Sequence, residues 1–216
     1  MMQAVKHVWG GEEFLLHPSK ALYWPRHAML VIADLHVGKV NHFRKAGMAV
    51  PEAVNQNNFQ RLTALLEQFP ARHILFLGDL THSNWNKGWD EFAALLNTWP
   101  HHNFSLVAGN HDILPSSTYS TANLTVYRDE MIVPPFRLAH YPPDQNDTEY
   151  FTISGHRHPG IVMRGKGRQR LRLPCFYFQE ETAVLPAFGS FTGLSIIKPH
   201  QQEQVFPVVD DKVLTV

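Results

Sequence analysis

The 216-residue chain is poor in cysteine, since Cys175 is the only one. A single cysteine excludes an intramolecular disulfide and a thiolate metal cluster, and it fits a reducing compartment such as the cytoplasm. The position of Cys175 between Pro174 and Phe176 predicts a core residue rather than a reactive one. Any metal ion would therefore need ligands from histidine, aspartate, asparagine or glutamate.

The chain also lacks net charge and long apolar runs. Its 19 basic and 19 acidic side chains cancel, so the total charge gives no indication of a nucleic-acid partner. No apolar run approaches membrane-spanning length, and the first residues, MMQAVKHVWGGEEF, lack the apolar stretch of a secretory signal. We therefore expect a cytoplasmic protein without a membrane partner. No repeat or Gly/Ser-rich linker divides the chain, which predicts a single domain over residues 1–216.

The order of apolar segments indicates the fold class. Three apolar runs have the length of buried strands: 28–33, 73–77 and 104–108. Between them, after Pro51 and again from Trp89 to Trp99, apolar residues recur at helical spacing. This alternation predicts an α/β fold with a mixed or parallel sheet covered by helices. After about Thr121, short strand-like runs separated by Pro and Gly indicate a mostly antiparallel sheet.

Polar side chains follow the apolar runs at the points where the strands are expected to end. The three runs of the first half are followed by Asp34 and His36, by Asp79, and by Asn110, His111 and Asp112. In the second half, His140 follows one run and His156 and His158 follow another. Ligands of open α/β sheets collect outside the carboxyl ends of the strands, so we expect these side chains to lie in one region.

Seven of these residues have metal-ligand side chains: Asp34, His36, Asp79, Asn110, His140, His156 and His158. The two oxygens of Asp79 can bridge two cations, and the amide oxygen of Asn110 adds a ligand without adding charge. Two neighbouring divalent ions clamp the attacking and leaving oxygens of an in-line displacement and lower the pKa of the water between them. A single Asp or His after a strand is more often a turn or cap residue. Five such motifs in succession favour a two-metal site instead.

The chemistry of this ligand set also indicates the kind of metal. Imidazole suits transition ions better than hard, oxygen-seeking cations. We expect two divalent transition-metal ions, with Mn foremost and Fe, Zn or Ni as alternatives, rather than Mg or Ca.

At these residues the chain resembles the calcineurin-like metallophosphoesterases. The family series D-x-H, G-D, G-N-H-[DE], H and G-H-x-H is present as Asp34-Leu-His36, Gly78-Asp79, Gly109-Asn-His-Asp112, His140 and Gly155-His-Arg-His158. The resemblance covers roughly residues 28 to 185. It implies a four-layer αββα sandwich and a phosphodiesterase that acts by attack of a metal-bridging hydroxide.

The resemblance also implies a role for each site residue. One metal would be held by Asp34, His36, Asp79 and His158, and the other by Asp79, Asn110, His140 and His156. His111 would then be the catalytic histidine that is not a ligand, steadying the phosphate and protonating the leaving oxygen. Many family members carry an acid three residues after the bridging aspartate to orient this histidine. This chain has His82 there, which leaves the partner of His111 open.

Four further stretches are similar to the bacterial ligase-associated branch of the family: DLHVGKVNHFRKAGMAVP (34–51), GDLTHS (78–83), GHRHPG (155–160) and RLRLPCF (170–176). That branch is described as a DNA-damage-response phosphodiesterase or endonuclease. The resemblance therefore implies a DNA substrate, a part in DNA repair, and a functional association with a DNA ligase, a helicase and a nuclease.

The stretch 157–172 is basic, with six basic residues and no acidic one: Arg157, Arg164, Lys166, Arg168, Arg170 and Arg172. Gly165 and Gly167 predict a hairpin turn there, and its charges could bind a nucleic-acid backbone or only be solvated. Two other functions stay open. One is a phosphatase or phosphohydrolase acting on a small phosphorylated molecule or nucleotide. The other is a scaffold that keeps the fold without catalysis.

Overall fold

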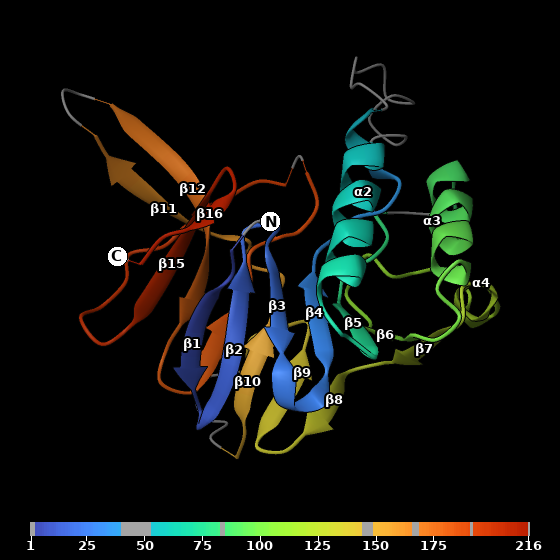
Figure 1. Ribbon diagram of the computed structural model, residues 1–216, viewed down its shortest axis with the longest axis horizontal. Coiled ribbons are helices and arrows are strands. Elements are labelled where there is room, and N and C mark those ends of the chain that lie inside the picture. The colour runs from blue at the N-terminus through green and yellow to red at the C-terminus, as the bar shows by residue number, and fades with distance from the viewer. Residues whose placement is uncertain are drawn as a thin grey trace.

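The computed structural model describes residues 3–39, 53–82, 85–143, 149–165, 169–190 and 192–215. Two β-sheets face each other, and helices cover the outer face of the first sheet (Figure 1). The first sheet contains, in spatial order, β1 (Val5–Trp9), β2 (Glu12–His17), β3 (Ala21–Trp24), β4 (Met29–Ala33), β5 (His73–Leu77), β6 (Asn103–Val107) and β7 (Leu124–Tyr127). Strands β1 to β4 are antiparallel neighbours, whereas β4 to β7 are parallel.

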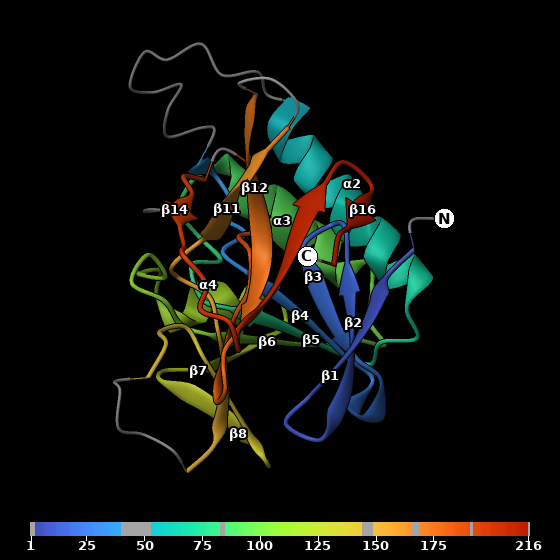
Figure 2. The ribbon, with the colours of Figure 1, turned by 90° about the vertical axis from the view of Figure 1, so that its left-hand side faces the viewer.

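The second sheet is built from the C-terminal part of the chain. Its main path runs β14 (Ser195–Ile196), β11 (Pro159–Arg164), β12 (Arg170–Phe178), β13 (Thr182–Val184), β10 (Phe151–Ser154), β9 (Phe136–Ala139) and β8 (Glu130–Val133). Strand β15 (Gln204–Val209) pairs with β12 and with β16 (Lys212–Val213). Strands β11 and β12 extend as a two-stranded ribbon beyond their neighbours (Figures 1 and 2).

The described helices are η1 (Pro25–His27), α2 (Ala53–Gln68), α3 (Lys87–Asn97) and α4 (Ser116–Thr121). Helix α3 begins after Asn86, whose side-chain oxygen accepts a hydrogen bond from the main-chain N–H of Gly88 at 2.9 Å. Helices α2 and α3 lie side by side against the first sheet (Figure 1). None of the helices in the described ranges is long and apolar enough to cross a membrane.

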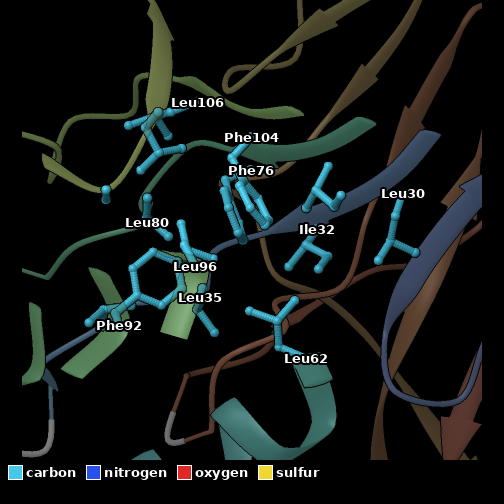
Figure 3. Packing of buried hydrophobic residues seen from close by; sticks show 14 of the residues in the cluster. Leu30, Ile32, Leu35, Leu62, Phe76, Leu80, Phe92, Leu96, Phe104 and Leu106 are labelled. Atoms are coloured by element: carbon cyan, nitrogen blue, oxygen red, sulfur yellow. The ribbon is translucent and has the colours of Figure 1, made fainter. Parts of the chain in front are cut away.

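The central strands are buried on both faces because each face packs against a different layer. In β4 and β5, Leu30, Ile32 and Phe76 point toward the helices, where they meet Leu62 of α2 and Phe92 of α3 (Figure 3). The alternate residues of the same strands pack between the two sheets, together with residues of the second sheet: Val31, Ala33, Leu75, Leu77, Phe136, Ile153 and Phe176. This double burial explains why the central strands read as continuous apolar runs.

The two-sheet α/β fold confirms the expected class, and the buried Cys175 is a core residue as expected. The predicted strands and the two longer helices are present within one or two residues. In the part of the chain that the structure describes, however, every helix lies at or before Thr121, so the helical layer expected over the second sheet is not seen there.

The expectation of a mostly antiparallel second half was partly wrong. Strand β7 joins the first sheet parallel to β6, and β10 pairs in parallel with both β9 and β13. Strands β1 to β3 and helix α4 were not predicted. Strand periodicity reports which side chains are buried but not which neighbour a strand pairs with, so direction and sheet membership were not visible in the pattern.

Candidate metal centre

The polar residues that follow the strands come together where the ends of the two sheets meet. In the first sheet, Ala33, Leu77 and Val107 lie at one level, so the segments that follow them leave the sheet side by side. In the second sheet, Ala139 and Ser154 are paired in the same way ahead of His140 and Gly155. The two edges are in contact, since the Nε2 atom of His140 lies 3.4 Å from Oδ1 of Asp79.

Two groups of three ligand-type side chains form at this edge. Asp34, His36 and His158 make the first group, and Asp79, His140 and His156 make the second. Within each group the three nearest ligand atoms lie within 4.8 Å of one another. The groups adjoin, because His140 approaches both Asp79 and, at 4.0 Å, Asp34. Residues that were expected to act together are therefore together in space.

Two motif glycines let the ligands approach so closely. Gly78 has a φ of +74°, and a Cβ atom on it would lie 1.9 Å from Nδ1 of His140. A Cβ atom on Gly109 would lie 2.4 Å from Oδ1 of Asp79. Neither position can carry a side chain unless a ligand residue moves, which explains why glycine stands directly before Asp79 and Asn110.

Five of the ligand-type residues have left-handed backbone conformations that non-glycine residues rarely adopt. Their φ values lie between +46° and +65°, at Asp34, His36, Asp79, His156 and His158. Each such residue costs of order 1–3 kcal/mol, a cost that persists where surrounding structure and function demand it. The clustering of backbone strain at this edge indicates a functional site, and this indication is independent of the chemistry of the side chains.

Hydrogen bonds orient the second group. The Nδ1 atom of His140 lies 3.3 Å from the main-chain oxygen of Leu77, so Nδ1 carries the proton and Nε2 is left with a lone pair. Nε2 of His140 lies 3.2 Å from Nδ1 of His156. The main-chain N–H of His156 donates to the buried carboxylate of Asp34, at 3.1 Å from Oδ2. Asp34 thereby ties the two groups together.

Two histidines of the centre, His36 and His156, have lowered pKa values that favour the neutral form. Burial lowers the pKa of His36 to about 2, and the charge of Lys39 and the neighbouring histidines lower it further. Burial, followed by the effect of His140, lowers the pKa of His156. Neutral imidazoles are the form that binds a metal ion.

The residues present fit divalent cations. Both ring nitrogens of His36 and Nε2 of His158 are buried without a hydrogen-bond partner among the described residues. Buried polar atoms are nearly always satisfied, so three unpaired imidazole nitrogens beside two carboxylates need an explanation. A cation at each group would provide it, with the donor set of nitrogen and carboxylate oxygen that transition ions prefer.

Asn110 and Tyr141 border the second group. Asn110 is exposed, and its side-chain oxygen accepts a hydrogen bond of 3.2 Å from the Tyr141 hydroxyl. The ring of Tyr141 lies 4.7 Å from the rings of both His140 and His156. Tyr141 thus places Asn110 beside the second group. Tyr141 directly follows His140 in the sequence but was not predicted as a residue of the site.

His111 lies at the edge of the centre and keeps 39% of its side chain exposed. Its Nδ1 atom lies 3.0 Å from the main-chain oxygen of His82, and its Nε2 atom lies 3.9 Å from Oδ2 of Asp79. The main-chain N–H of His111 also donates to Oδ1 of Asp79 at 3.0 Å. The ring therefore directs Nε2 toward the carboxylate of the second group.

Asp112, the last residue of the GNHD motif, holds two motif loops together. Its carboxylate accepts hydrogen bonds from the main-chain N–H groups of Leu80, Thr81 and Gly109 and from the Thr81 hydroxyl. Burial raises the pKa of Asp112, and the bonds from Thr81 and Gly109 oppose this effect. Asp112 was recognised as part of the motif, but this clamp could not be read from the sequence.

Lys39 is a second residue near the centre that was not predicted from the sequence. Burial lowers its pKa, whereas the negative charges of Asp79 and Asp34 raise it, so its ammonium group lies within electrostatic reach of both carboxylates. A cation at this position would attract a phosphate group. The only available signal was its place in the stretch 34–51, of which residues 40–51 lie outside the described part.

The basic stretch forms the expected hairpin of β11 and β12, which begins directly after His158. Arg164 lies opposite Arg170, and Val162 lies opposite Arg172. The three arginines are exposed and share one face of the ribbon because alternate residues of a strand point to the same side. Lys166 and Arg168 lie outside the described residues.

Comparisons with known proteins bear on the family and the fold. The sequence profile of the family described as calcineurin-like phosphoesterase matches residues 28–183. Among solved structures, the chain is similar to the nuclease MPE of Pseudomonas putida, with 28% identity and a TM-score of 0.85 over 99% of this chain and 100% of that one. A protein of unknown function from Aquifex aeolicus, AQ665, aligns over 65% of this chain and 82% of its own, with 21% identity and a TM-score of 0.44. The comparison with curated proteins found no match.

Proposed function

The chain belongs to the calcineurin-like phosphoesterase family, a family of metal-dependent phosphoesterases, and from this premise we propose that it is a dinuclear phosphodiesterase acting on DNA. The observation that carries the proposal is the pair of adjoining ligand groups, Asp34–His36–His158 and Asp79–His140–His156. Asn110 joins the second group through its position next to Tyr141.

Two divalent cations, when bound at these groups, supply Lewis-acid stabilisation of a phosphodiester and make water a stronger nucleophile at neutral pH. The residues of the chain provide positioning and proton transfer. The Nδ1–H group of His111 donates to the oxygen of His82, which leaves Nε2 free to carry a proton to the leaving oxygen. The clamp of Asp112 keeps the loop of His111 and the loop of Asp79 at a constant separation.

Two features favour DNA as the substrate. The first is the similarity to a nuclease over essentially the whole of both chains. The second is the arginine face of the β11–β12 ribbon, because like charges placed directly opposite each other, as in the pair Arg164 and Arg170, destabilise an isolated sheet. A polyanion lying along this face would remove that repulsion. The association with a DNA ligase, a helicase and a nuclease that the resemblance implies remains part of the proposal.

The experiment compares a phosphodiester with a phosphomonoester. We expect the Mn-loaded protein to hydrolyse bis-p-nitrophenyl phosphate much faster than p-nitrophenyl phosphate and to cleave single-stranded or duplex DNA. Asp79→Asn should abolish these activities and lower the metal content. Asp129→Asn, which changes an exposed aspartate of another loop, should leave both unchanged.

Three results would contradict the proposal. A preference for the monoester would favour a phosphatase acting on a small molecule. Cleavage of RNA but not of DNA would show that DNA is not the substrate. A lack of hydrolysis in a protein that carries two metal ions per chain would favour a non-catalytic scaffold.

A further inference from the structure

A cavity of about 540 Å³ lies beside Lys20 and Arg61, and its lining includes none of the residues of the two ligand groups. Six of its lining residues are apolar: Pro18, Leu171, Leu173, Pro174, Val208 and Val209. Leu171 and Leu173 alternate with the arginines along β12, so these two leucines line the cavity from the face of the ribbon opposite to the arginine face. The volume falls within the range of small-molecule sites, which combine apolar walls with a few placed polar groups.

In the described ranges, the two cations at the cavity donate hydrogen bonds to neutral acceptors only. The Lys20 ammonium group donates to the main-chain oxygen of Gly189 at 3.3 Å. The Arg61 guanidinium donates to the oxygens of Ser19 and Phe188 and to the side chain of Asn58. Among the described residues, neither cation forms an ion pair with a carboxylate. In the described part of the chain, no carboxylate therefore balances their charges, although the ring of Phe188 lies 4.0 Å from the Arg61 guanidinium.

The pKa values of Lys20 and Arg61 are lowered in this environment. Burial lowers the pKa of Lys20 to about 7, and the charge of Arg61 lowers it further. Burial also lowers the pKa of Arg61 to about 10. Partly buried cations that repel each other are stabilised by an anion, and among the described residues Lys20 uses only one of its three N–H donors.

One acidic residue, Asp210, belongs to the cavity lining. It is exposed and makes no ion pair with Lys20 or Arg61. Asp210 therefore does not neutralise the two cations. Its negative charge opposes the binding of an anion, so removal of this charge should tighten binding.

We propose that this cavity binds a phosphorylated ligand of nucleotide size, with its phosphate on Lys20 and Arg61 and its base against the apolar wall. Two adjacent cations suit a phosphate dianion better than a single carboxylate, and arginine and lysine are the usual phosphate ligands. The apolar wall of Leu171, Leu173 and Pro174 suits a base rather than a bare ion. The ligand is either a free nucleotide or the phosphorylated end of a nucleic-acid strand.

The experiment measures binding of AMP by equilibrium dialysis in the presence of EDTA, so that the metal centre does not contribute. Lys20→Met should weaken binding about tenfold or more, because a hydrogen bond from a charged group to the phosphate is lost. Asp210→Asn should tighten binding by up to about fivefold, because a repulsive charge is removed at an exposed turn that tolerates asparagine. Lys6→Met, at an exposed lysine paired with Glu13, is the matched control and should bind like the wild type.

The source of the phosphate is found by competition. Inorganic phosphate and a 5′-phosphorylated oligonucleotide should displace AMP if strand ends occupy the site, whereas displacement by phosphate and free nucleotides alone identifies a nucleotide site. The proposal is overturned if AMP does not bind, or if Lys20→Met and Asp210→Asn both bind like the wild type. It is also overturned if His156→Ala, made in the metal centre, abolishes AMP binding. All these outcomes are independent of whether the enzyme cleaves DNA.

Discussion

The Nδ1 atom of His111 lies 3.0 Å from the main-chain carbonyl oxygen of His82. This contact identifies the partner that orients His111, the proposed catalytic histidine, which the sequence left open. Many family members carry an acidic side chain at this position, whereas here the main-chain oxygen of His82 accepts the hydrogen bond from His111. The side chain of His82 lies nearly parallel to the ring of His111, with 5.2 Å between their centroids.

We expect His111→Ala to slow hydrolysis by about 10²-fold or more while both metal ions remain bound, because it removes acid–base help and not a ligand. His82→Ala should reduce the rate far less, because the carbonyl that accepts the hydrogen bond is retained. Steady-state kinetics and elemental analysis of both variants test this. A metal-free His111→Ala protein would show that His111 is a ligand after all.

Gly78→Ala should disrupt the second ligand group. The added methyl group would lie 1.9 Å from Nδ1 of His140 and would displace this ring, so metal content and activity should fall together. Gly11→Ala is the matched control, since Gly11 has a similar φ of +77° and nothing within 4 Å of the added carbon. Backbone strain alone, of order 1 kcal/mol, should lower the stability of both variants. Equal activity of the two would mean that His140 can move aside without loss of the site.

The metal ions should be transition ions rather than Mg. The centre offers His36, His140, His156 and His158 as nitrogen donors, which Mg binds poorly. After chelation, activity should return with Mn and only weakly with Mg. Full activity with Mg, measured with transition metals rigorously excluded, would contradict this expectation.

The arginine face of the hairpin should act through charge alone. Replacement of Arg164 and Arg170 by Gln should weaken DNA binding and reduce the slope of log K against log salt by about 0.7–0.9 for each lost phosphate contact. Hydrolysis of a small chromogenic diester should hardly change. Arg72→Gln serves as the control, because this exposed arginine precedes β5 at the end of the strand opposite to Asp79. Equal losses on DNA and on the small diester would mean that the hairpin supports the fold of the active site.

His17 should make the stability depend on pH. Burial lowers the pKa of this histidine from 6.5 to about 4 in the folded chain. The unfolded chain therefore gains a proton at higher pH than the folded chain, and the free energy of unfolding falls as the pH is lowered from about 6.5 to about 4. The loss from this residue is at most about 3 kcal/mol.

The variant His17→Asn isolates this effect. Asparagine can still accept the hydrogen bond from the main-chain N–H of Ser19 but does not titrate in this range. Urea unfolding in the presence of EDTA between pH 7 and pH 4 should show a flatter dependence for the variant. Parallel curves for the two proteins would show that His17 titrates alike in the folded and unfolded chains.

The sequence by itself determined the family, the central strands with their two covering helices, and the residue types at the strand ends. It could do so because these features are local. A strand covered on both faces must be apolar throughout, and the ligand residues must follow directly where it ends. Asp34, Asp79 and His111 are recognisable for this reason, and the structure brings the strand ends that carry them together.

Only the tertiary structure decided which atoms of different loops meet. The hydrogen bond from His111 to the carbonyl of His82, the clamp of Asp112 and the contact of Tyr141 with Asn110 join segments that are about 30 residues apart in the chain. Lys20 comes from the turn between β2 and β3 and Arg61 from helix α2, and they share a cavity with β12 only after both sheets have packed. Such contacts depend on sheet register and packing, and neither leaves a periodic trace in the sequence.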